Sequence, residues 1–261
     1  MSQEPGASLA FLTAAEAEGY RGGSYVVVVR TREELARWLR EPARGVEWLQ
    51  VEGLLQDQGA WAIAAQGASG LPLDVILTDP ATEFSSLYRL VDARVVRNVR
   101  VTMPAAPGFM RALRLAASLQ LPVRLLPGQP SAEALAELTE AAHFYLHDPM
   151  VEAPVEFFHS LLAALRGAEG DTLWLMLEED PGVFARGKAR QPHDFAEKHL
   201  AGLIERGAEC ASCQWQKVCA GYFKWPDPAY ACAGVKELFA SIQSAADEIG
   251  RDLAGQEAAA S

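Results

Sequence analysis

Residues 25–40 read YVVVVRTREELARWLR, a strand pattern that leads directly into a helix pattern. The four valines after Tyr25 are typical of a strand that is buried on both faces, as strands of parallel sheets are. Thr31 and Glu34 have the spacing of a capping box, in which each side chain bonds the backbone of the other at the start of a helix. The stretch therefore predicts one β–α unit.

The same alternation repeats as far as about residue 145. The apolar runs begin about 21 to 27 residues apart, which is the length of one strand plus one helix. Ser131 has the position of an N-cap for the last helix, AEALAELTEAAHFYL. The further strand candidates are VEWLQV (46–51), LDVILT (73–78), VRNVRVT (96–102) and PVRLL (122–126).

Repeated right-handed β–α units form either an open parallel sheet or a barrel. Five units are too few to close an eight-stranded barrel. We therefore expect an α/β fold that contains a partial (β/α) barrel.

The alternation stops after Pro149, and the rest of the chain carries helical patterns. These patterns cover residues 151–167, 172–180, 194–207 and 235–255, with a break at Pro181 and Gly182. The expected organisation is an N-terminal arm (1–24), the partial barrel (25–148), a helical bridge (149–207), a cysteine-bearing segment (208–234), and a C-terminal helix and tail (235–261).

Composition narrows the possible partners. The chain has 34 acidic and 23 basic residues and a formal net charge of −11, which argues against a nucleic-acid surface. Its apolar runs fall well short of the roughly 20 residues of a membrane span, and the N-terminus lacks the basic region of a signal peptide. We therefore expect a cytoplasmic protein with no nucleic-acid or membrane partner. In a reducing compartment, clustered cysteines favour metal or cluster binding over disulfides.

All four cysteines fall in residues 209–234, ECASCQWQKVCAGYFKWPDPAYACAG. Their spacing is Cys210-x2-Cys213-x5-Cys219-x12-Cys232. Four thiolates can saturate a zinc ion or hold the four irons of a [4Fe–4S] cluster. A zinc ribbon normally pairs two Cys-x2-Cys knuckles, and the second knuckle is missing here, which favours the cluster.

This spacing, with AGYF after the third cysteine, resembles the distal half of the SPASM domain, which follows the barrel of radical SAM peptide-maturing enzymes. The resemblance implies a small helical, twitch-like cap in which Cys210, Cys213, Cys219 and Cys232 all ligate one [4Fe–4S] cluster. The family pattern places a further cysteine where this chain has Phe223, and two more upstream. A second cluster is therefore not expected.

Radical SAM catalysis also requires a Cys-x3-Cys-x2-Cys loop after the first barrel strand. Here YVVVVR continues straight into TREELAR, so we expect no SAM binding and no SAM cleavage. The resemblance thus implies a degenerate, pseudo-radical-SAM protein. Its expected role is that of an accessory in ribosomal peptide modification, which binds a precursor peptide or a modifying enzyme, or transfers electrons.

Two alternatives remain open. The four cysteines could form a four-thiolate zinc clamp on a scaffold that binds peptides or proteins. The chain could also be a stand-alone barrel enzyme that works at the carboxyl ends of its strands, where Glu52, Asp79 and Thr102 are candidates. These three residues form no recognisable set of acid, base and nucleophile, so no catalytic residue is assigned.

Overall fold

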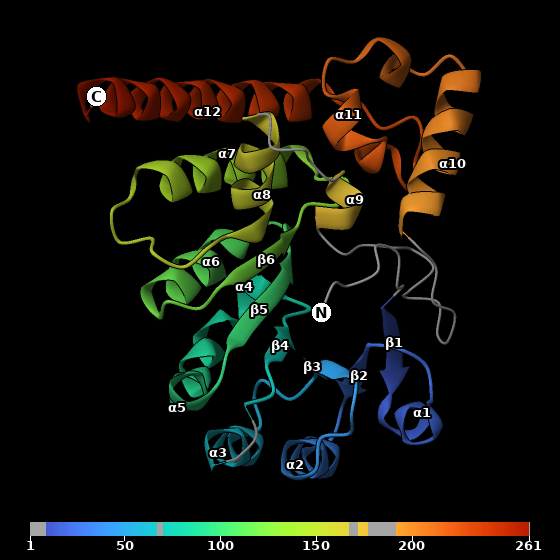
Figure 1. The fold of residues 1–261 in the computed structure, drawn as a ribbon, viewed down its shortest axis with the longest axis vertical. Coiled ribbons are helices and arrows are strands. Elements are labelled where there is room, and N and C mark those ends of the chain that lie inside the picture. The colour runs from blue at the N-terminus through green and yellow to red at the C-terminus, as the bar shows by residue number, and fades with distance from the viewer. Residues whose placement is uncertain (1–8, 67–69, 167–171, 177–191, 261) are drawn as a thin grey trace.

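The computed structural model describes residues 9–66, 70–166, 172–176 and 192–260. Six strands form one sheet in chain order, and every neighbouring pair is parallel (Figure 1). This confirms the α/β class with repeated β–α units. The strands are β1 (Ala10–Thr13), β2 (Tyr25–Val29), β3 (Val46–Glu52), β4 (Leu73–Ile76), β5 (Val99–Pro104) and β6 (Val123–Leu126).

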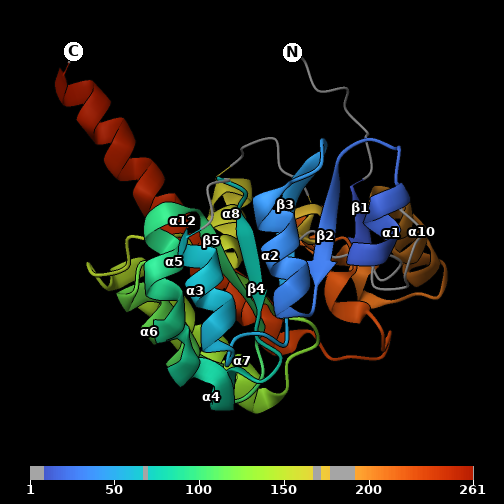
Figure 2. The ribbon, with the colours of Figure 1, turned by 90° about the horizontal axis from the view of Figure 1, so that it is seen from below.

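Helices follow the strands, and two of them, after Thr31 and after Ser131, start where the sequence predicts. The Thr31–Glu34 capping box is formed, and the Ser131 side chain accepts a hydrogen bond from the amide of Ala134. Figure 2 shows α2, α3, α5 and α6 in a row along one face of the sheet. The helices of this part are α1 (Ala14–Gly19), α2 (Arg32–Arg40), α3 (Gln58–Gln66), α4 (Pro80–Glu83), η1 (Phe84–Leu90), α5 (Val91–Val96), α6 (Phe109–Ser118) and α7 (Ala132–His147).

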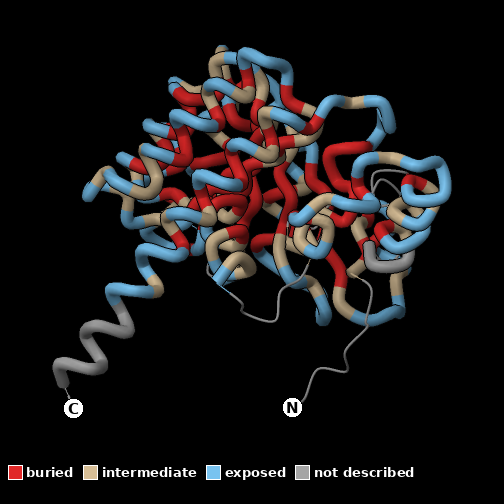
Figure 3. Tube along the Cα trace, turned by 90° about the horizontal axis from the view of Figure 1, so that it is seen from above, coloured by how far each residue is buried: buried red, intermediate tan, exposed pale blue. Residues whose placement is uncertain are grey.

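The two faces of the sheet differ in chemistry. Alternate strand residues such as Val27, Leu49 and Val101 join one buried apolar core, and Figure 3 shows the buried residues concentrated in the interior of the molecule. The intervening positions place buried polar side chains on the other face. These are Gln50, Asp74, Thr102 and Arg124.

Asp74 is the centre of that polar face and is only 1% exposed. Its carboxylate accepts hydrogen bonds from the Thr102 hydroxyl at 2.6 Å, from Arg100 at 2.9 Å and from Arg124 at 2.8 Å. Arg100 also pairs with Glu156 at 3.0 Å. A buried carboxylate requires this degree of pairing, because an unpaired charge is costly to remove from water.

The N-terminal end of the sheet differs from the prediction. Residues 1–24 were expected to form an arm, but β1 and α1 lie within them and add a β–α unit, with Ala10 opposite Tyr25 and Thr13 opposite Val28. A strand of four residues is too short to show a clear period. The available signal was the capping box formed by Thr13 and Glu16.

The strand predicted at residues 96–102 was also placed too early, because α5 continues to Val96 and β5 begins at Val99. Arg97 explains the boundary. Its buried guanidinium donates to the carbonyls of Ala64 at 2.9 Å and Leu71 at 3.4 Å, and so ties the end of the helix to the preceding unit.

The C-terminal part is helical, as predicted. It packs beside β6, where Val155 forms a parallel bridge to Val123. Of the helix predicted at 172–180 the structure describes only the first turn, and the predicted break at Pro181 and Gly182 lies outside the described residues. No described helix is long and apolar enough to cross a membrane. The segments are α8 (Glu156–Leu165), α9 (Leu173–Met176), α10 (Pro192–Glu205), η2 (Glu209–Ser212), α11 (Gln216–Cys219), η3 (Tyr222–Lys224) and α12 (Ala233–Ala260).

Candidate metal centre

The cysteine-bearing segment lies between α10 and α12 and is attached to the loop after β6 (Figure 1). Side chains and backbone groups of residues 128–130 bond residues 222–230, so the segment is held at the carboxyl end of β6. The bonds run from the Gly128 amide to Tyr222 Oη (3.2 Å), from Gln129 Nε2 to the carbonyls of Phe223 (3.0 Å) and Asp227 (2.7 Å), and from Tyr230 Oη to the Pro130 carbonyl (2.8 Å).

All four predicted ligands line one cavity, and all four are free thiols. Cys210 and Cys232 are buried, while Cys213 and Cys219 are partly exposed as whole residues, although the thiol of Cys219 is itself buried. Aromatic rings form the inner wall, where Phe239 lies edge-on to Trp215 and Phe223. The structure therefore brings together cysteines that are up to 22 positions apart in the sequence.

Cys219 has the most organised surroundings. The two residues after it have left-handed backbone conformations, with φ of 45° at Ala220 and 75° at Gly221. This turn places the backbone amides of Gly221, Tyr222 and Phe223 around the Cys219 sulfur, where they act to lower the pKa of the thiol. Such amides stabilise a thiolate and are typical of the surroundings of sulfur ligands in metal sites.

Burial has the opposite effect on the thiols. It raises the pKa of Cys219 to about 11 and that of Cys232 to about 12, and it also raises the pKa of Cys210. These thiols are therefore protonated at neutral pH. Because the thiolate is the ligand, metal or cluster binding at this site has to release protons.

Two lysines and one glutamate lie beside the sulfurs. Glu209 pairs with Lys236 and with Lys224 (2.9 Å), and the two lysines lower the pKa of Glu209 to about 2. Lys224 is only 6% exposed, and its ammonium also donates to the Tyr230 carbonyl. The three side chains together leave one extra positive charge next to the four sulfurs, which partly offsets the charge of a thiolate-bound metal.

The four cysteines are suitable ligands for a metal centre, but the cavity that they line is small. In the described part of the chain, no group of three or more His, Cys, Asp or Glu side chains is arranged to hold a metal ion. Four sulfurs around one zinc ion would lie about 3.8 Å apart, given a Zn–S distance of about 2.3 Å. The cavity of about 30 Å³ has room for about one water molecule. A [4Fe–4S] core is larger, so the sulfurs have to separate to admit it.

Sequence reasoning missed Glu209 and Lys236 as members of this site. The available signals were local, since Glu209 adjoins Cys210 and Lys236 follows Cys232 by one helical turn. Lys217, which the sequence also places near the cysteines, is an exposed residue of α11.

The candidates for a barrel active site do not converge. Glu52 pairs with Arg30 at 2.7 Å, and Thr102 donates to Asp74. Asp79 stands at the N-terminus of α4, where its amide donates to Glu83 at 2.9 Å. Each residue is thus bonded within its own neighbourhood, and within the described ranges these bonds do not connect the three to one another.

In comparisons with known proteins, no family model, no curated protein and no solved structure matches this chain. The function therefore has to be inferred from the chemistry of the cysteine site and from its place in the fold.

Proposed function

We propose that this chain is an iron–sulfur protein that holds one [4Fe–4S] cluster on Cys210, Cys213, Cys219 and Cys232. The observation that carries the proposal is that the four cysteines of the chain line one cavity, where three backbone amides are directed at the Cys219 sulfur. When bound, the cluster would supply a one-electron redox centre.

Each protein group near the sulfurs would have a distinct effect on that centre. Amide hydrogen bonds and the positive charge of Lys224 stabilise the more negative, reduced state, while the aromatic wall of Trp215, Phe223 and Phe239 keeps water away from the sulfurs. The same amides and charge stabilise thiolates against the effect of burial. The amides and Lys224 would therefore help to retain the cluster after the cysteine thiols have lost their protons.

The proposed fold of residues 10–126 is a partial barrel of the radical SAM type, with a SPASM-like cap. Six parallel strands in sequential order support this interpretation, as does the attachment of the cysteine segment at the carboxyl end of β6. Sites of β/α folds are built at the carboxyl ends of their strands.

The proposed role is that of an accessory protein in ribosomal peptide modification, which binds a precursor peptide or a modifying enzyme or transfers electrons to it. Two observations support an accessory rather than a catalyst that cleaves SAM. Neither β1 nor β2 is followed by a cysteine loop, because Thr13 and Thr31 cap α1 and α2 directly, and the polar face of the sheet is occupied by the Asp74 network.

Anaerobic purification followed by iron and sulfide analysis tests the proposal. We expect about four irons and four sulfides per chain, with broad visible absorption, and loss of both in Cys219→Ala. Ser212→Ala is the matched control, because Ser212 is an exposed residue of the same segment. One zinc ion per chain without sulfide would support the four-thiolate zinc alternative and contradict the proposal.

A further inference from the structure

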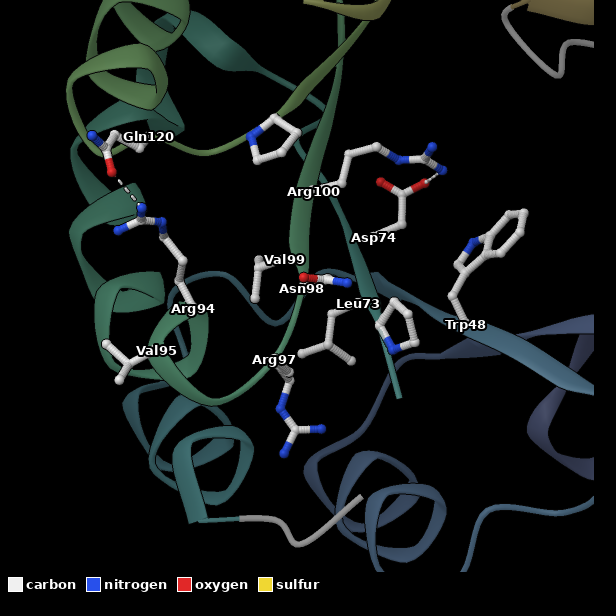
Figure 4. A pocket seen from close by; sticks show the side chains of 12 residues that line it. Trp48, Leu73, Asp74, Arg94, Val95, Arg97, Asn98, Val99, Arg100 and Gln120 are labelled. Carbon is white, nitrogen blue, oxygen red and sulfur yellow. Dashed lines mark hydrogen bonds and ion pairs between the residues drawn. The ribbon is translucent and has the colours of Figure 1, made fainter. Parts of the chain in front are cut away.

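A second cavity lies at the amino ends of the strands, away from the cysteine segment. It has a volume of about 520 Å³ and reaches the first residues of β4 and β5, Leu73 and Val99. A cavity of this size can take several side chains of a partner or a small ligand. Strand β5 passes through its middle, as Figure 4 shows.

Arginine side chains stand on both sides of β5 in this cavity (Figure 4). On one side Arg94 donates to Gln120 Oε1 at 2.6 Å. On the other side Arg100 lies over the Trp48 ring, 5.5 Å from its centre, and pairs with both Asp74 and Glu156. A guanidinium has five N–H donors, so Arg94, which bonds the neutral Gln120 side chain, can still bind a carboxylate.

The lining of the cavity carries a net positive charge, whereas the whole chain has a net charge of −11. Arg94, Arg97 and Arg100 line the cavity, against one acidic residue, Asp74. Arg89 is exposed, and Arg94 is partly exposed beside the cavity. A negatively charged partner would therefore be attracted here and repelled over most of the remaining surface.

An exposed apolar strip adjoins the arginines. Tyr88, Val91, Val95 and Val96 are 61%, 36%, 78% and 46% exposed, and they make up half of the large hydrophobic residues that are exposed in the described chain. Tyr88 and Val91 are three apart in a 3-10 turn, and Val95 follows one α-helical turn later, so the three share one face. Val95 also lines the cavity, which makes the strip and the cavity one continuous surface.

The shape of this surface favours a peptide over a compact molecule. From Tyr88 to Val95 the strip runs roughly 10 to 14 Å along η1 and α5, beyond the cavity itself. A two-fold contact between two copies of this chain would bring the same arginines of both copies together, and like charges would oppose it. An acidic peptide segment with apolar side chains can follow the length of the strip, and the arginines attract it.

We propose that this surface is a docking site for a peptide segment rich in acidic and apolar side chains. A carboxylate of the peptide lies beside Arg94, and its apolar side chains cover Val91, Val95 and Val96. The proposal gives a binding surface to the accessory role proposed above, and in that sense rests on it. Its residues, however, are at the other end of the strands from the cysteines, so the two proposals can fail separately.

Fluorescence anisotropy with a labelled synthetic peptide of Glu and Leu residues tests the docking site, with a Lys and Leu peptide of the same length for comparison. We expect the acidic peptide to bind, the lysine peptide not to bind, and the affinity to fall as salt is added. Arg94→Glu and Val95→Asp should each weaken binding at least about tenfold. Both positions are exposed enough for the variants to fold, which circular dichroism checks.

Arg114→Glu is the matched control, because Arg114 is an arginine of α6 that is 57% exposed, pairs with Glu140 and lies outside this surface. It should leave the affinity unchanged, and so should Cys219→Ala, which removes only the cluster site. Equal binding of the two peptides, or unchanged affinity in both Arg94→Glu and Val95→Asp, would overturn the proposal. Self-association of the wild-type chain that Val95→Asp abolishes would assign the surface to a second copy and also overturn it.

Discussion

Individual residues explain why the cysteine segment holds its shape. Gly221 has a φ of 75°, and a Cβ at this position would come within 2.8 Å of Leu203 and 3.2 Å of His199. Gly221 therefore permits both the turn that directs amides at Cys219 and the close packing of α10 against that turn. No other residue meets both conditions without strain.

Gly221→Ala should lower the free energy of unfolding by about 1–2 kcal/mol, because a side chain in the left-handed region is strained. Gly250→Ala is the matched control: Gly250 lies in α12 with nothing within 4 Å of an added Cβ, and alanine there should be neutral or stabilising by up to about 1 kcal/mol. Urea denaturation measures both changes. Equal effects of the two substitutions would argue against the role assigned to Gly221.

Asp74 is the residue that holds the buried polar side chains of the sheet together. Asp74→Ala breaks the buried pair of Asp74 with Arg124, whose side chain is 6% exposed. We expect a loss of about 3–5 kcal/mol in the free energy of unfolding, as for other broken buried pairs.

The control for Asp74 is Arg114→Ala, which breaks the pair of Arg114 with Glu140, both more than half exposed. It should change the free energy of unfolding by less than about 1 kcal/mol, because water screens an exposed pair. If Asp74→Ala were as mild as this control in urea denaturation, the polar face would not depend on its central carboxylate.

Among the structural elements, the loop after β6 connects the sheet to the cysteine segment. The Gln129 amide donates to the carbonyls of Phe223 and Asp227, and its oxygen accepts from the Asp227 amide at 3.3 Å. One side chain thus makes three of the bonds that hold the segment at the carboxyl end of the sheet.

Gln129→Ala should therefore loosen the cysteine segment and leave the sheet intact. Hydrogen exchange should become faster at the amides of residues 222–230 and stay unchanged in β2 to β5, because the lost bonds serve local opening. Gln58→Ala, at an exposed glutamine of α3, is the control and should change neither region. Faster exchange throughout the sheet would show that the two parts open together.

The sequence predicts the elements that carry strong local signals. A valine run, a capping box and an N-cap serine place β2, α2 and α7 to within a residue or two, and the clustering of cysteines identifies the candidate site. Strand β1 is too short to show a period, and Arg97 shifts the start of β5 through bonds to residues about 30 positions away. The pairing of Glu209 with Lys224 and Lys236 likewise depends on how the segment folds back on α12.

At the scale of the whole molecule, the parallel sheet lies between a cysteine-rich segment and an arginine-lined cavity. The cysteine segment is attached at the carboxyl end of β6, and the arginine-lined cavity lies at the amino ends of β4 and β5. Because every strand runs in the same direction, the two surfaces are at opposite ends of the sheet. The two proposed sites, for a redox centre and for a peptide, are therefore separated by the length of the sheet.

Native mass spectrometry of the anaerobically purified chain tests the central claim, one [4Fe–4S] cluster on the four cysteines, most directly. The account predicts a single added mass that corresponds to four irons and four sulfides per chain. That mass should be absent in Cys219→Ala and retained in Ser212→Ala. An added mass of one zinc ion in the wild-type chain, or a cluster mass that persists in Cys219→Ala, would contradict the account.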